Sequence, residues 1–201
     1  MIPIGLIFIL VLLAGTLTGQ TKNKVPHEKW VVMAQGKLSV QGKTNLNAFT
    51  CEINGYTNKD TLSLRAGKRP EETFYVSGKL RYPVDDFKSG NAIMTRELKK
   101  TLNSAQFPQM TVQAVSLERI PDLQTGPQTV KGMIEIELRG ATKRFPVICE
   151  MSEDASKQVY ISCQRSLNFS DFNIEPPRRL GGLLKTRDEL LVRLSFAIRP
   201  I

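Results

Sequence analysis

Histidine is almost missing from this chain: His27 is the only one among 201 residues. A Ser-His-Asp or Cys-His catalytic arrangement would depend on it, yet we expect it beside a processed N-terminus, where a base is poorly held. One histidine and three widely spaced cysteines leave no zinc-binding spacing. The glycine-rich phosphate loops of nucleotide-binding proteins are also missing. We therefore expect neither a metal ion nor a nucleotide cofactor.

The candidate carboxylate pairs for general acid–base chemistry each consist of adjacent residues. Adjacent residues of a strand point to opposite faces, so neighbours do not form a catalytic pair. A hydrolase or isomerase built on them ranks last among our hypotheses, and we expect no enzyme. The pairs are Glu71 with Glu72, Asp85 with Asp86, and Asp188 with Glu189.

Acidic residues are too few to balance the basic ones. The chain has 28 Lys and Arg against 19 Asp and Glu, a net charge of +9. This excess favours anionic partners such as nucleic acid or lipid head groups. The aromatic residues fall mostly on apolar strand faces, whereas a nucleic-acid surface exposes them among basic residues. We expect no nucleic-acid partner; an anionic membrane surface remains a candidate.

The N-terminal run of residues 2–19 contains no charged side chain and is followed by the polar, basic stretch QTKNK. This pattern is typical of a secretory signal peptide, so we predict a signal peptide over residues 1–20, without a distinct cleavage motif, and one domain over residues 21–201. The alternative is an uncleaved segment that anchors the protein, because the run approaches the length that spans a bilayer.

Three cysteines remain in the expected domain: Cys51, Cys149 and Cys163. An exported protein meets oxidising conditions, which allow one disulfide and leave one thiol over. The segment FPVICEMSEDASKQVYISC reads as a hairpin whose loop is centred near Ser156, which places Cys149 opposite Cys163. They are the first candidate pair; the alternative is three small buried side chains.

Most of the chain alternates apolar and polar residues with a period of two, as in strands with one apolar face. The segment of residues 89–110 differs, because Ile93, Leu98 and Leu102 have helical spacing, Asn91 is a plausible N-cap and Pro108 prevents extension. We predict an all-β fold, an antiparallel barrel or sandwich, with one short helix. A barrel of about eight strands has an interior that is filled by side chains or holds one ligand.

Four segments, taken together in order, resemble the YceI-like family. They are residues 38–56, 76–113, 130–147 and 167–198. In the second, Met94, Leu98 and Leu102 match the helix core, and Phe107-Pro108 matches the entry into the next strand. The resemblance implies a bacterial periplasmic or secreted protein with a lipocalin-like antiparallel β-barrel. It also implies an apolar interior that holds a polyisoprenoid, an isoprenoid quinone or a similar amphiphile, and no enzymatic chemistry.

The apolar strand and helix faces are the candidate lipid-binding residues under this resemblance. They are Phe74, Val76, Leu80, Leu98, Leu102, Met110, Val112, Ile134, Ile136, Leu138, Val192, Leu194 and Phe196. The competing hypothesis is a filled barrel that acts as an envelope or stress interaction module through a basic, membrane-facing surface. The sequence is compatible with either a monomer or a homodimer.

The stretch FNIEPPRRLGG precedes the last predicted strand. We expect Phe172 to end the previous strand, the two prolines to stop pairing, and Asp188 to lead into the last strand, which closes the barrel. Arg178 and Arg179 either solvate this loop or meet an anionic head group or membrane surface.

Overall fold

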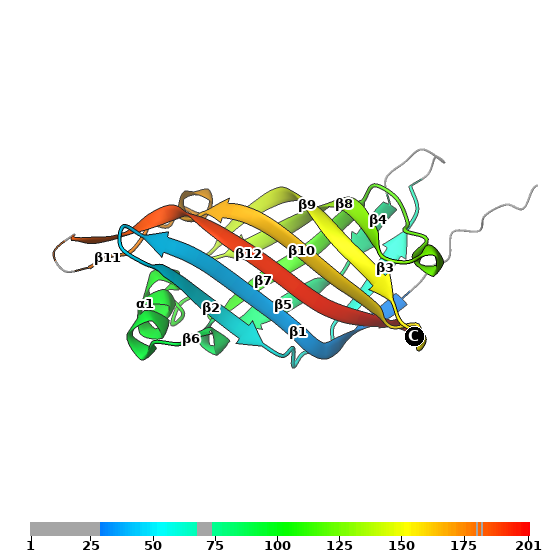
Figure 1. Ribbon diagram of the computed structural model, residues 1–201, viewed down its shortest axis with the longest axis horizontal. Coiled ribbons are helices and arrows are strands. Elements are labelled where there is room, and N and C mark those ends of the chain that lie inside the picture. Colours follow the sequence, from blue (N-terminus) through cyan, green and yellow to red (C-terminus); the bar gives the residue numbers. More distant parts are fainter. Residues whose placement is uncertain (1–28, 68–73, 180, 182) are drawn as a thin grey trace, which may run out of the picture.

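The computed structural model describes residues 29–67, 74–179, 181 and 183–201. Eight antiparallel strands of this part form a closed ring (Figure 1). The predicted antiparallel barrel of about eight strands with one short helix is confirmed. In ring order the strands are β1 (Lys29–Thr44), β3 (Thr61–Arg65), β4 (Phe74–Ser77), β7 (Gln109–Leu117), β8 (Gln128–Leu138), β9 (Ala141–Glu153), β10 (Val159–Asn168) and β12 (Leu184–Pro200).

The other elements extend this ring or close one end of it. β2 pairs with β1, β6 pairs with β2, β5 pairs with β7, and β11 pairs with β12. The short strands are β2 (Ala48–Asn54), β5 (Lys79–Pro83), β6 (Lys88–Ser89) and β11 (Arg178–Arg179). The helices are α1 (Ala92–Leu102) and the 3-10 turns η1 (Val84–Asp86), η2 (Leu123–Thr125) and η3 (Phe169–Phe172).

Alternation along the strands places one face of the ring in the core. In β9 the buried residues are Phe145, Val147, Cys149 and Met151, and the residues between them are exposed. Successive side chains of a strand point to opposite faces, so this pattern turns every second residue toward the barrel interior. The same rule identifies the inward positions of the neighbouring strands.

The turn between β8 and β9 has two residues, Arg139 and Gly140. Both have a positive φ, 50° and 76°, as a tight type I′ hairpin turn requires. A Cβ on Gly140 would lie 3.0 Å from the Phe107 ring, so glycine also admits close packing there. This turn fixes the β8–β9 register, in which Leu138 opposes Ala141.

β12 closes the barrel, as expected, by pairing with β10 on one side and β1 on the other. Two details of the prediction were wrong. β12 begins at Leu184, so Asp188 lies inside the strand, and Phe172 belongs to the turn η3. The prolines interrupt pairing only briefly, since Arg178 of β11 already pairs with Lys185. A short hairpin therefore precedes the long strand.

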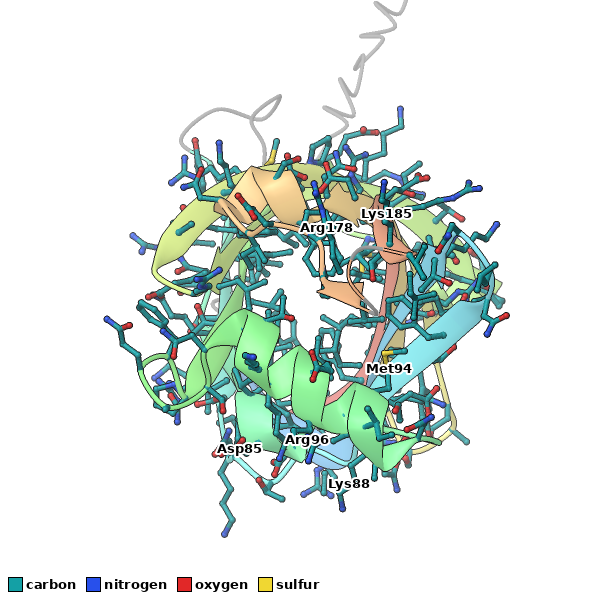
Figure 2. The ribbon with its side chains drawn as sticks, turned by 90° about the vertical axis from the view of Figure 1, so that its left-hand side faces the viewer. Asp85, Lys88, Met94, Arg96, Arg178 and Lys185 are labelled. Atoms are coloured by element: carbon teal, nitrogen blue, oxygen red, sulfur yellow. A yellow bond between two sulfur atoms is a disulfide. The ribbon has the colours of Figure 1, made fainter. Side chains whose placement is uncertain are left out.

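α1 covers one end of the barrel (Figures 1 and 2). The predicted cap is confirmed: the Asn91 side chain accepts hydrogen bonds from the N–H groups of Ile93 and Met94, at 2.8 and 3.4 Å. The expected apolar stripe is partly wrong, because Leu102 is buried but Ile93 is 49% exposed. Met94 packs against the core in its place. Helical spacing predicts how often apolar residues recur, but it does not determine which residues at the margin of the apolar face are buried.

The signal peptide predicted over residues 1–20 lies outside the described residues. Among the helices that are described, none has both the length and the apolar character needed to cross a bilayer.

Candidate functional site

A cavity of about 620 Å³ occupies the barrel between its middle and the end that carries Pro200. Every strand of the eight-membered ring contributes lining residues. The lining is mainly apolar, for example Ile136 of β8, Ile161 of β10 and Phe196 of β12. Exposed residues such as Ile120 and Lys157 mark its mouth at this end. The interior is thus a solvent-connected chamber and not a filled core.

The opposite end is plugged. Leu98 and Leu102 of α1 meet Phe87, Phe169 and Phe172 around a second, smaller cavity of about 80 Å³. The two cavities lie next to each other along the barrel, because they share six lining residues. These are Val112, Ile134, Ile136, Leu167, Val192 and Leu194. One apolar interior therefore runs from the mouth to the α1 plug.

Twelve of the thirteen predicted lipid-binding residues line this interior. The large cavity is lined by Val76, Leu80, Val112, Ile134, Ile136, Val192, Leu194 and Phe196. The small cavity is additionally lined by Leu98, Leu102, Met110 and Leu138. Phe74 lines neither, although it has the same strand parity as Val76; it is half-buried in the first position of β4, opposite Leu117.

The sequence reasoning missed several lining residues near the mouth. Trp30 of β1 and Leu62 and Leu64 of β3 line the large cavity, as does the loop from Ile120 to Gln124. The alternation in the segment TLSLR could have identified Leu62 and Leu64, because both apolar positions are buried in β3. The loop at Ile120 carries no periodic pattern, so only the fold places it there.

Cys149 and Cys163, the candidate pair, form a disulfide with a Cα–Cα distance of 4.2 Å. They lie directly opposite each other in the β9–β10 ladder, and both line the large cavity. Cys51 is the free cysteine, and its burial raises the pKa of the thiol to about 11. A protonated, buried thiol is a poor nucleophile, so Cys51 is a structural residue.

A polar cluster ties the loop after β2 to β5 outside the barrel. The Tyr56 hydroxyl donates to Asp60, which also pairs with the Arg81 guanidinium, and the Arg81 N–H donates to the Tyr56 oxygen at 2.9 Å. Burial, followed by the bond to Asp60, raises the pKa of Tyr56 to about 12. Burial also raises the pKa of Tyr82, whose hydroxyl has no partner among the described residues. The cluster therefore holds no readily ionised phenol.

Arg178 is exposed on the β11–β12 hairpin and does not line the cavities (Figure 2). The hairpin lies at the plugged end with α1, opposite the mouth (Figure 1). The side chain of Arg179 lies outside the described part of the structure. Among the described residues, no group of His, Cys, Asp and Glu side chains could hold a metal ion.

Solved structures with the same fold include the following three. The crystal structure of BcnA from Burkholderia cenocepacia has 13% identity and a TM-score of 0.62, covering 83% of this chain and 98% of that one. A polyisoprenoid-binding domain from Saccharophagus degradans, implicated in plant cell wall breakdown, has 10% identity and a TM-score of 0.60, covering 86% and 98%. The Campylobacter jejuni YceI protein has 13% identity and a TM-score of 0.51, covering 72% and 83%. At such identities the likeness shows a shared fold alone.

Sequence comparison gives the family. Curated protein sequences yield no match. The model of the YceI-like domain matches residues 54–198, which run from the end of β2 to near the end of β12. The chain belongs to the YceI-like family.

Proposed function

We propose that the protein binds a long apolar isoprenoid-type lipid inside the barrel, for carriage or storage in the cell envelope. The observation that carries this proposal is the apolar cavity of about 620 Å³. Its volume falls within the roughly 300–1,000 Å³ of typical ligand sites. Each buried CH₂ contributes about 0.8 kcal/mol, so a chain of prenyl units can bind with few polar contacts. The polyisoprenoid-binding domain from Saccharophagus degradans supports the same ligand class.

The first experiment extracts protein from its native host with organic solvent and identifies lipids by mass spectrometry. We expect a prenyl lipid in a stoichiometric amount. Recovery of no lipid, together with no uptake of prenyl lipids in solution, would contradict the proposal.

A cavity-filling variant tests the location of the ligand. Ala114 lines the cavity, so Ala114→Trp should fill part of it and lower prenyl-lipid uptake at least tenfold. The matched control is Gln113→Trp, which adds the same side chain on the outer face of β7, because neighbouring strand residues face opposite ways. Equal uptake by both variants would place the ligand elsewhere.

Location in the periplasm or outside the cell, after removal of residues 1–20, is part of this proposal. The Cys149–Cys163 disulfide supports an oxidising compartment. Fractionation of the native host, with mass spectrometry of the mature N-terminus, tests both the compartment and the cleavage. An intact N-terminus in the membrane fraction would favour the anchored alternative.

A second partner, an anionic membrane surface, is favoured by the plugged end of the barrel. Leu46 and Leu183 are 73% and 76% exposed there. The Asn45 side chain joins their two hairpins, donating to the Leu183 carbonyl at 2.8 Å and accepting from the Lys185 N–H at 3.0 Å. Arg178 and Lys185 lie on the same hairpin (Figure 2). Apolar side chains beside basic ones suit the boundary between head groups and acyl chains.

A further inference from the structure

Arg165 occupies an inward position of β10. Its neighbours of the same parity are Ile161, Cys163 and Leu167, and all of them line the large cavity. Arg165 lines the cavity as well. It opposes Val192 of β12, another lining residue. A basic residue therefore interrupts an otherwise apolar row of lining residues on β10.

No described side chain neutralises Arg165. Among the described residues its side chain makes no hydrogen bond or ion pair. The other charged side chains of the lining belong to the mouth and balance one another: Lys29 and Lys157 against Asp122 and Glu153. Lys157 and Glu153 also form a salt bridge of 3.0 Å. Arg165 is thus the unbalanced charge of the described cavity wall.

The wall of the barrel is also interrupted beside Arg165. Backbone pairing between β9 and β10 ends at Ile148 and Gln164, one residue before it. From there β10 pairs only with β12 and β9 only with β8. Farther along, Phe172 of η3 packs against Phe145 of β9, with ring centroids 5.9 Å apart. Arg165 lies between the end of the ladder and this contact, and it is exposed despite its inward parity.

The position of this charge limits the ligands that can fill the cavity. Because Arg165 is exposed, its guanidinium is hydrated before a ligand binds, and a wholly apolar ligand offers it no hydrogen-bond acceptor. A phosphate or carboxylate accepts two parallel hydrogen bonds from a guanidinium, which is a strong and directional arrangement. An anionic head group at Arg165 thus gains charge-assisted hydrogen bonds that an uncharged head group cannot match.

We propose that Arg165 binds the anionic head group, a phosphate or a carboxylate, of a lipid whose tail fills the cavity. The inference rests on the proposed lipid binding and narrows its ligand to anionic amphiphiles. The gap between β9 and β10 gives the head group contact with solvent at the side of the barrel, while the tail remains among apolar side chains.

The test compares ligands with one tail and different head groups. Delipidated full-length protein is titrated with geranylgeranyl phosphate and geranylgeraniol below their aggregation concentrations. Binding is measured by calorimetry and by the fluorescence of Trp30, which lines the cavity and is the only tryptophan. Hexadecanoate and hexadecanol form a second pair that separates carboxylate from phosphate recognition. In at least one pair, we expect the anion to bind at least about tenfold more tightly than the alcohol, which is the size of effect expected for a hydrogen bond to a charged group.

Arg165→Gln should abolish this preference and leave the affinity for the alcohols unchanged, whereas Arg165→Lys should retain part of it. The matched control is Arg193→Gln, which removes the same charge from the outer face of β12, where Arg193 donates to Gln164 at 2.7 Å. It should keep the full preference.

The outcomes separate this inference from the proposed function. Equal affinity of the wild-type protein for alcohol and anion overturns the role of Arg165 but leaves lipid binding standing. An anion preference that survives Arg165→Gln also overturns it. Failure of the wild-type protein to bind any of the four ligands overturns both. The comparison of ligands on the wild-type protein does not depend on the folding of a variant.

Discussion

At the scale of the residue, single glycines determine where the barrel strands bend. Gly78 separates β4 from β5 and has a φ of 127°, which side chains other than glycine rarely allow. A Cβ at this position would lie 2.3 Å from the carbonyl oxygen of Thr61, a backbone atom that cannot rotate away. The break allows β5 to continue along β7 while β4 bridges β3 and β7.

Replacing Gly78 tests this geometry. Gly78→Ala should lower the free energy of unfolding by about 2 kcal/mol, because it combines backbone strain with a steric clash. The measurement is urea denaturation followed by circular dichroism. Gly90→Ala is the control, since a Cβ at Gly90 would meet no atom within 4 Å and its φ is not positive; its change should stay within about 0.5 kcal/mol. Equal effects of the two substitutions would contradict the role of Gly78.

At the scale of the element, the β9–β10 hairpin has a joined half and a separated half. The joined half runs from the turn to Gln164 and contains the disulfide. In the separated half, Phe172 of η3 packs against Phe145 of β9. The disulfide therefore joins the two strands next to the place where their ladder ends.

Reduction of the disulfide should destabilise this hairpin. The cysteines are 14 residues apart, and cross-linking a loop of about 15 residues contributes about 3 kcal/mol in the chain-entropy model. We expect urea denaturation in the presence of reductant to show a loss of this order. The double variant Cys149→Ala, Cys163→Ala should show this lower stability both with and without reductant. If reductant still lowers the stability of this double variant, the disulfide is not the cause of the loss. The only cysteine left in the double variant is Cys51, a buried free thiol.

At the scale of the whole molecule, the two ends of the barrel differ in chemistry. One end opens into the cavity among Ile120, Lys157 and Pro200. The other is closed by α1 (Figures 1 and 2) together with η3. Leu46 and Leu183 are exposed on the hairpins at this end. Ligand entry and membrane contact are thus proposed for different ends of the barrel, so substitutions at one end can test one role without disturbing the other.

Membrane contact at the plugged end predicts a dependence on the two exposed leucines. Leu46→Ser combined with Leu183→Ser should lower co-flotation with vesicles that contain phosphatidylglycerol by several-fold, because each loses buried apolar area at the interface. Ile148→Ser is the control, since Ile148 is 57% exposed on the side of the barrel. Loss of flotation in the control but not in the double variant would move the contact to the barrel side.

Local features of the sequence predicted most strands and the helix, and they indicated a candidate cysteine pair. Alternation revealed the inward face of β8 and β12, the Asn91 cap began α1, and the hairpin spacing joined Cys149 to Cys163. Each of these depends on residues close together in the chain, so their periodicity and spacing are readable without the fold.

Only the folded barrel shows that the interior is open and which inward residues face it. Alternation gives the side of a strand but neither its height in the barrel nor the room between opposite walls. This is why Phe74 was placed in the cavity and Trp30 was overlooked, although both belong to strands with a recognisable apolar face. The environment of Arg165 also depends on where β9 and β10 separate, which is set by η3 and by contacts between segments distant in the sequence. The sequence alone therefore specified the faces of the strands, and the closure of the ring established what those faces enclose.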